Sequence, residues 1–203
     1  MIRLCIIFLL VLLSGCATTP EPLSSVDVDV LWAGRQSVLS QLQHWKMEGR
    51  IAVQLDEQGW QAGMHWHQQN DRYQMDMLDP FGRKVARLTK GSQGVDLRLS
   101  KGESAHAANA ESLMQRLLGY SLPVSGLRYW VLGIPDPQNR IHQIRLGAAG
   151  RLVRLEQSGW EVSYQRYHHH STTIDLPSKM TLISKGLKVK VVVSEWELMM
   201  YDG

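Results

Sequence analysis

The chain has very little cysteine, with Cys5 and Cys16 as the two examples among 203 residues. Both lie at the N-terminus, Cys5 within an apolar run and Cys16 directly after it. If that run is removed as a signal and Cys16 is modified, no free thiol remains in the mature chain. The sequence therefore predicts no disulfide, no cysteine metal site and no cysteine nucleophile, which suits an oxidising compartment.

An excess of charge of one sign is also lacking, since 22 Lys and Arg stand against 19 Asp and Glu. Loss of residues 1–15 would remove Arg3 and leave 21 against 19, which is too even to indicate a nucleic-acid partner. A second long apolar run is missing, as are the nucleotide-binding loop, G-x-S-x-G and H-E-x-x-H motifs. These absences predict a binding protein without a cofactor rather than an enzyme.

The N-terminus is organised as an export signal. Arg3 precedes an uninterrupted apolar run at residues 4–13, and Ser14 and Gly15 then lead to Cys16. The run is too short to span a bilayer but fits a signal-peptide core. Its end resembles the bacterial lipobox, which implies acylation of Cys16 and, with Ala17 following, an outer-membrane location. An ordinary secretory signal with a chance cysteine is the alternative.

Three segments follow from this pattern. Residues 1–15 are predicted to be a removed signal, residues 16–29 a lipidated cysteine with a flexible tether, and residues 30–203 a single domain. Helical spacing of apolar residues predicts a helix over residues 30–45, packed on a sheet through Leu31, Val38, Leu42 and Trp45.

Period-two alternation then predicts antiparallel strands, each with one apolar and one wet face. The predicted strands are residues 47–55, 60–68, 73–77, 85–88, 95–99, 152–157, 160–167, 180–184 and 187–198. Helical periodicity predicts a helix between residues 107 and 120, and a short one capped by Ser125 and ending at Trp130. The fold class is therefore mainly β with helices (α+β), and a sheet this large is expected to curl into a barrel or split.

An apolar residue stands where a polar turn is expected. Strand-like alternation enters and leaves Asp79-Pro80-Phe81-Gly82, which is therefore predicted to be the tip of a hairpin. Such a tip faces water, so the ring of Phe81 gains little from the fold and much from a membrane or a partner. Pro80, Phe81 and Gly82 are predicted to form a membrane-insertion loop.

Methionine and tryptophan are frequent, at nine and seven residues, whereas phenylalanine occurs twice. Many of them fall on the apolar faces of the predicted strands. Flexible Met and large Trp side chains suit a roomy, adaptable apolar cavity, although they also serve to fill an ordinary core.

Other polar clusters have plainer explanations. The three histidines at residues 168–170, and the pair His65 and His67, are interpreted as solvated side chains, so that no metal site is predicted. The basic residues Arg83, Lys84, Arg87 and Lys90 are consistent with acidic partners, with phospholipid headgroups, or with a solvated rim.

Several motifs, taken in order, carry a family resemblance. They are Trp45 with residues 49–53 (GRIAV), residues 66–68 (WHQ), 71–73 (DRY), 79–82 (DPFG), 122–124 (LPV), 127–135 (LRYWVLGIP), 157–160 (QSGW) and 191–196. With the lipobox, they are similar to the outer-membrane lipoprotein-localisation receptors of the LolB family over nearly the whole mature sequence.

The resemblance implies an unclosed antiparallel β-barrel whose open side is covered by a helical lid. It further implies a monomeric receptor that accepts acylated lipoproteins from a soluble periplasmic carrier and incorporates them into the outer membrane. Phe81 stands where the family usually has an exposed leucine. A lipid-acyl hydrolase and a structural envelope lipoprotein without cargo are the alternatives.

On this interpretation the apolar strand and helix faces line a cavity for acyl chains. The residues predicted to line it are Ile51, Val53, Met64, Trp66, Tyr73, Met75, Met77, Leu97, Leu113, Leu117, Leu118, Trp130, Tyr164 and Trp196.

Overall fold

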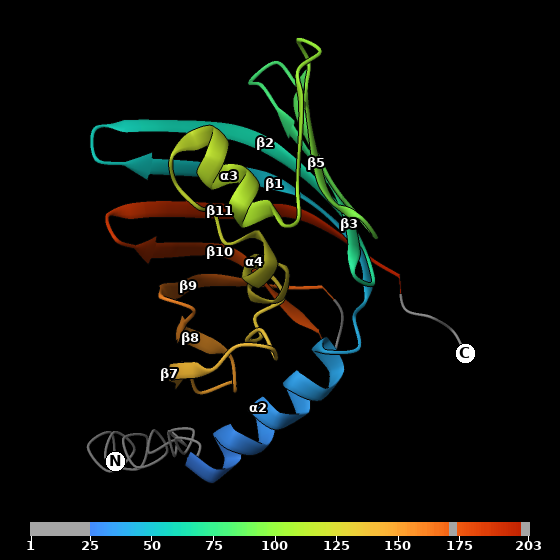
Figure 1. Ribbon diagram of the computed structural model, residues 1–203. Coiled ribbons are helices and arrows are strands. Elements are labelled where there is room, and N and C mark those ends of the chain that lie inside the picture. Colours follow the sequence, from blue (N-terminus) through green and yellow to red (C-terminus); the bar gives the residue numbers. More distant parts are fainter. Residues whose placement is uncertain (1–24, 171–173, 200–203) are drawn as a thin grey trace, which may run out of the picture.

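The computed structural model describes residues 25–170 and 174–199 (Figure 1). The predicted signal, Cys16 and residues 16–24 of the predicted tether lie outside the described residues. The first described element is the helix α2 (Ser25–Leu39), so residues 25–29 are helical and the folded part begins five positions before residue 30.

Eleven antiparallel strands form one curved sheet in the order β6-β5-β4-β3-β2-β1-β11-β10-β9-β8-β7 (Figure 1). They are β1 (His44–Leu55), β2 (Gln58–Gln69), β3 (Arg72–Leu78), β4 (Lys84–Gly91), β5 (Gly94–Leu99), β6 (Ser104–Ala107), β7 (Ile141–Leu146), β8 (Leu152–Gln157), β9 (Trp160–His169), β10 (Asp175–Ser184) and β11 (Leu187–Leu198). The sheet consists of two meanders, β1 to β6 and β7 to β11. They join where β1 pairs with β11, and the edge strands β6 and β7 do not pair with each other. This confirms the predicted mainly β, unclosed barrel.

Two helices lie over the concave face of this sheet, namely α3 (Ala110–Leu118) and α4 (Val124–Trp130) (Figure 1). The α3 helix has strong local end signals. The Asn109 side chain accepts a hydrogen bond from the Ser112 amide at 2.8 Å, and Gly119 ends the helix with φ of 79°. The α4 helix begins differently from the prediction, because Ser125 donates from its amide and hydroxyl to the Glu111 carboxylate instead of capping the helix. This contact ties the two helices together.

The prediction for residues 30–45 was wrong at its C-terminal end. The α2 helix stops at Leu39, and Trp45 already belongs to β1. The expected apolar stripe is therefore not the buried face: Leu31 and Val38 are exposed, whereas Leu39 is buried. The stripe depended on including Leu42 and Trp45, which are apolar because they enter the sheet's core rather than because they continue the helix.

Two edge strands escaped prediction, and one strand is longer than predicted. Nearly all of β7 is exposed on both faces and β6 has four residues, so neither shows a useful alternation. The β10 strand begins at Asp175 rather than residue 180, and it accommodates Pro177 because the register with β9 is irregular there.

The β10–β11 hairpin shows how local chemistry sets the turns. Lys185 and Gly186 both have positive φ, as do Ser158 and Gly159 between β8 and β9. Two consecutive residues with positive φ are typical of the two-residue turns whose twist matches that of antiparallel strands. The predicted turns at these two sites are thus confirmed.

Two groups of contacts organise the single hydrophobic core. At the start of β1, Trp45 packs against Trp66 and Trp196 with ring centroids 5.3 Å apart in both pairs. Under α4, the buried Gln157 side chain accepts from the Trp130 indole at 2.9 Å and donates to the carbonyls of Asp136 and Asn139. A buried amide so fully paired fixes α4 and the following loop on the sheet.

All these contacts lie within residues 25–199, so a chain beginning at Ala17 retains every described interaction. Within the described segments, no helix combines the length and the apolar character needed to cross a bilayer.

Candidate functional site

An apolar cavity of about 420 Å³ lies between the concave face of the sheet and the helical roof. Strands supply Ile51, Met75, Met77, Leu97 and, from the other meander, Leu182 and Val189. The roof comprises Met114 and Leu118 from α3, Leu122 and Pro123 from the connection, and Val124 and Leu127 from α4. Among the lining residues, Gln61 and Asp79 alone have polar side chains. The cavity can therefore solvate a hydrocarbon chain but offers almost nothing to bind a polar ligand.

The alternation of the strands explains the inward position of three of the lining residues. Ile51 on β1 and Met75 and Met77 on β3 occupy the inward positions of their strands. Successive side chains point to opposite faces of a strand, so every second residue reaches the interior. The cavity volume falls in the range of about 300–1,000 Å³ typical of small-molecule pockets.

Five of the predicted cavity residues line this cavity, and nine do not. Those that line it are Ile51, Met75, Met77, Leu97 and Leu118. The other nine are Val53, Met64, Trp66, Tyr73, Leu113, Leu117, Trp130, Tyr164 and Trp196.

The nine are placed elsewhere for identifiable reasons. Trp66, Trp196 and Tyr73 belong to or touch the aromatic cluster around Trp45, which fills the barrel at the opposite end of these strands. Met64 and Leu113 are fully buried core residues, whereas Leu117 is exposed on α3. Trp130 and Tyr164 are joined by a hydrogen bond from the Tyr164 hydroxyl to the Trp130 carbonyl at 3.1 Å. Val53 borders a different, outward-facing hollow.

Several lining residues were missed by the sequence reasoning. They include Ala62, Leu78, Val85, Ala86, Leu88, Leu99, Met114, Leu122, Leu127, Leu182 and Val189. Ala62 and Met114 were already on predicted apolar faces, and most of the others lay in predicted strands or helices, so the elements that carry these residues were readable. The position of each residue along the barrel could not be predicted, because it depends on pairing between strands that are distant in sequence.

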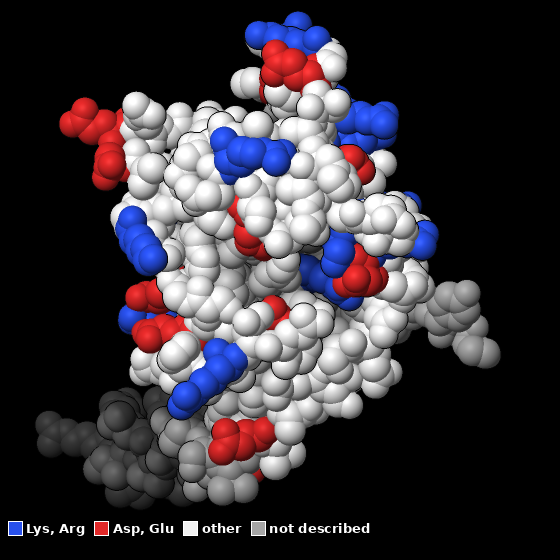
Figure 2. Space-filling view, in the orientation of Figure 1, with Lys and Arg blue, Asp and Glu red and all other residues white. Residues whose placement is uncertain are grey.

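The rim of the cavity carries exposed apolar side chains. Trp60, Val85, Leu99 and Leu118 all contribute to the lining and are at least 36% exposed. In Figure 2 the face that holds α3 and α4 is mostly uncharged, with basic and acidic side chains scattered over it. An open apolar rim of this kind is a feature of surfaces that meet a lipid or an apolar partner.

The hairpin tip beside this rim presents Phe81 to solvent, with 83% of the residue exposed. Asp79 organises the turn: its Oδ1 accepts hydrogen bonds from the amides of Phe81 at 2.9 Å and Arg83 at 3.0 Å. The Arg83 side chain donates to Asp79 Oδ2 at 2.7 Å, and its guanidinium lies 5.4 Å from the centre of the Phe81 ring. Gly82 adopts φ of 79°, which closes the turn. The exposed ring is therefore held on an ordered turn.

This organisation predicts a pH response of the tip. The Arg83 hydrogen bond, assisted by the two amides, lowers the pKa of the Asp79 carboxyl. Because the folded-state pKa is depressed, the stabilisation is complete above the unfolded value of about 3.9 and is lost as the pH falls through the lower folded value. We expect the amide NMR signals of Phe81 and Arg83 to shift with a midpoint below that value.

The control for this titration is Asp79→Asn, which keeps a side-chain oxygen but cannot titrate. The acid transition of the two amides should be missing in that variant. A transition of unchanged midpoint would show that another group is responsible.

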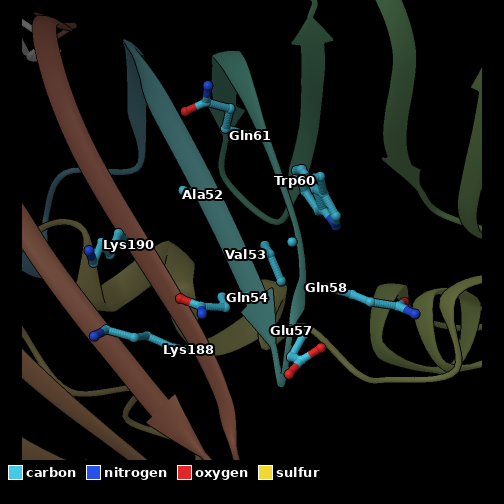
Figure 3. A pocket seen from close by; sticks show the side chains of 10 residues that line it. Ala52, Val53, Gln54, Glu57, Gln58, Trp60, Gln61, Lys188 and Lys190 are labelled. Atoms are coloured by element: carbon cyan, nitrogen blue, oxygen red, sulfur yellow. The ribbon is translucent and has the colours of Figure 1, made fainter.

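A second hollow, of about 390 Å³, lies on the outer face around the β1–β2 hairpin (Figure 3). It is bordered mainly by polar side chains, among them Gln54, Glu57, Lys188 and Lys190. Gln54 and the two lysines come from the wet faces of β1 and β11, so this hollow is an open polar surface rather than a site for hydrocarbon. Among the described residues, no group of three or more potential metal ligands is present.

The fold and the cavity together define the class of protein. It is an unclosed antiparallel β-barrel whose helical roof encloses an apolar cavity, with an exposed aromatic ring on a hairpin tip beside the rim.

The family profile described as Outer membrane lipoprotein LolB matches residues 43–196. An Outer-membrane lipoprotein LolB from Nitrosococcus oceani is 36% identical over 197 residues, covering 97% of this chain and 98% of the relative. Its counterpart from Ectopseudomonas mendocina is 34% identical over 200 residues and covers 97% of both chains. The chain belongs to the outer membrane lipoprotein LolB family. Membership makes it an outer-membrane lipoprotein with a general role in lipoprotein localisation.

Solved structures support the fold independently. A domain from Vibrio parahaemolyticus superposes with a TM-score of 0.57 at 6% identity, covering 87% of this chain and 92% of the other. A DUF1329 family protein from Desulfovibrio piger gives 0.55 at 8% identity, with coverage of 87% and 95%. At such identities the likeness shows the fold alone.

Proposed function

We propose that the chain accepts acylated lipoproteins from a soluble periplasmic carrier, holds their acyl chains in the apolar cavity and releases them into the outer membrane. The observation that carries this proposal is the cavity itself, which is lined almost wholly by hydrocarbon and opens at an apolar rim. An acyl chain costs about 0.8 kcal/mol per CH₂ to expose to water, on the order of 10 kcal/mol for a whole chain. A cargo with such chains needs a dry site at the end of its passage.

The transfer proceeds downhill in free energy. A ligand moves between sites only as far as its differential affinity allows, and the sequence carries no nucleotide-binding loop to drive the step. The carrier therefore binds the acyl chains less tightly than this cavity, and the bilayer binds them more tightly still. Acylation of Cys16 holds the chain at its destination membrane, where it acts as a monomer.

The roof provides the adjustable part of the site. A volume of about 420 Å³ lies near the lower end for ligand pockets, so a cargo with several acyl chains requires the cavity to widen. The α3 helix exposes Leu117 and Leu118 and joins α4 through the exposed Glu111–Ser125 contact. Displacement of α3 would add Leu117 to a cavity lining that already includes Leu118.

The cavity offers poor support for the hydrolase alternative. Its lining contains no serine, histidine or cysteine among the described residues, and the Asp79 carboxylate is engaged by Arg83 and two amides. A nucleophile and its base would have to be supplied from outside the apolar site.

Filling the cavity tests the proposal directly. In a non-acylated chain beginning at Ala17, Ala62→Phe places a ring in the space lined by β2, and Ala52→Phe adds the same ring on the outer face of β1. Displacing two methylene groups of the acyl chain costs about 1.6 kcal/mol. We therefore expect Ala62→Phe to weaken uptake of a fluorescent acylated peptide from the carrier by more than about tenfold.

The Ala52→Phe control should take up the peptide as the unmodified chain does. Equal uptake by both variants would remove this cavity from the mechanism. Failure of the unmodified chain to take any acylated peptide from the carrier would favour a structural lipoprotein without cargo.

A further inference from the structure

A basic groove lies on the outer side of the hairpin tip, separate from the cavity. It occupies about 250 Å³ between β4 and β5 and is lined by Lys84, Arg87, Arg98 and Ser100, with Val85, Ala86 and Leu99 at its border. The three border residues also line the apolar cavity. The groove and the cavity are therefore the two sides of one rim.

The charges in this groove are not balanced by the fold. Asp76 is buried and accepts both Lys84 at 2.8 Å and Arg87 at 2.6 Å, so one carboxylate serves two cations. Arg98 adds a third positive charge, and its side chain makes no hydrogen bond or ion pair within the part of the chain that the structure describes. Three positive charges against one negative charge leave a surplus of two.

Arg98 lies opposite an arginine whose carboxylate partner is already shared with Lys84. Arg87 and Arg98 are directly opposite partners on neighbouring antiparallel strands. Like charges at such positions destabilise a sheet. An anion bound between them would relieve the repulsion, and paired guanidinium groups suit the oxygens of a phosphate.

The sequence alone suggested a different set of basic residues. Lys90, which follows on the same strand, pairs with Asp71 at 3.1 Å, and Asp71 also accepts Arg128 at 3.0 Å. Lys90 is thus paired outside the groove and does not line it. Arg98 lines the groove instead, because it lies opposite Arg87 on the neighbouring strand.

The groove has a defined position relative to the exposed ring. The β3–β4 tip that carries Phe81 and the turn after β5 project from the same end of the molecule (Figure 1). Both basic and acidic side chains are visible at this end (Figure 2). A surface that meets lipid through Phe81 would bring Lys84 and Arg98 to the level of the headgroups, where basic residues are attracted to anionic lipids.

We propose that the groove formed by Lys84, Arg87, Arg98 and Ser100 binds the phosphate of an anionic phospholipid headgroup and orients the cavity rim on the bilayer. This inference rests on the proposed delivery to a membrane. The apolar border formed by Val85 and Leu99 accepts the adjoining part of the lipid, while the phosphate stays on the basic side.

Vesicle binding tests this assignment. The non-acylated chain beginning at Ala17 is mixed with phosphatidylcholine vesicles, with and without phosphatidylglycerol, and bound protein is measured by flotation. We expect phosphatidylglycerol to strengthen binding, and Arg98→Gln to weaken binding to these vesicles by about fivefold. Arg145→Gln, which removes an exposed arginine from the far edge strand β7, should leave binding unchanged although it alters the net charge equally.

Three outcomes would overturn the assignment. The first is an equal loss for Arg98→Gln and Arg145→Gln, which would indicate unspecific attraction. The second is full competition by inorganic phosphate at the concentration of lipid phosphate, which would indicate a free-anion site. The third is unchanged vesicle binding with weakened transfer from the carrier, which would assign the groove to a protein partner.

The proposed function is tested by a separate measurement on the same proteins. Uptake of the acylated peptide into the cavity should be equal in Arg98→Gln and the unmodified chain. Loss of uptake in the unmodified chain would defeat the proposed function while leaving the vesicle result to decide on the groove.

Discussion

A chain carrying Phe81→Glu is expected to fold normally and to accept acylated cargo, yet to fail in releasing that cargo into vesicles. Phe81 is 83% exposed, and the contacts found for it are confined to the turn, where its amide binds Asp79 and its ring lies near the Arg83 guanidinium. Its substitution therefore removes almost nothing from the core. The expected defect lies in the step at which the tip enters the lipid surface.

The expected size of the defect in cargo release follows from the side chain that is replaced. Burying a phenylalanine in an apolar environment stabilises by about 1.5–3 kcal/mol, and a carboxylate at the same depth adds a desolvation cost. Together these exceed about 3 kcal/mol, which corresponds to at least a hundredfold slower incorporation if the tip inserts in the rate-limiting step.

Phe81→Leu is the matched control, because it keeps an apolar side chain at the tip. It should retain most of the incorporation, while circular dichroism should show the same fold for both variants and the unmodified chain. A folded Phe81→Glu chain with normal incorporation into liposomes would remove the ring from the mechanism.

The largest loss of stability is expected for Gly49→Ala. Gly49 lies at an irregularity in the β1–β11 register, where Ser194 has no partner on β1 and donates its hydroxyl to the Glu48 carbonyl at 3.0 Å. A Cβ at Gly49 would clash with the Val192 carbonyl oxygen, so the backbone of the pairing strand must move. Overpacking costs typically 1–3 kcal/mol, and a backbone contact places this variant near 3 kcal/mol.

Gly34→Ala provides a control that should raise the free energy of unfolding instead of lowering it. Nothing lies within 4 Å of a Cβ added at this exposed position in α2. Removing a glycine from a helix interior stabilises by about 0.5–1 kcal/mol. Urea unfolding of the chain beginning at Ala17 should show both effects, and a Gly49→Ala midpoint equal to that of the unmodified chain would contradict the close approach at the bulge.

Local patterns were sufficient for much of the fold. Alternation correctly separated Met47, Ile51 and Met64 from the wet face, and the positive-φ hairpins followed from Ser158-Gly159 and Lys185-Gly186. The exposed ring at Phe81 was also readable, because an apolar residue in a Pro/Gly turn has no inward position to occupy. Failures occurred where a local pattern was weak, as in β6 and β7, or where apolar residues of two elements were merged into one stripe at Trp45.

The sequence by itself determined which side of each strand is apolar, where the chain turns, and which residue the tip presents. Only the tertiary structure decided which apolar residues line the cavity and which fill the barrel. Met75 and Trp66 are cross-strand partners with inward side chains, yet Met75 borders the cavity whereas Trp66 packs in the aromatic cluster. The reason is that alternation encodes the face of a strand, while the neighbours that an inward side chain meets, Leu182 in the cavity or Trp45 in the aromatic cluster, are set by the pairing and curvature of the whole sheet.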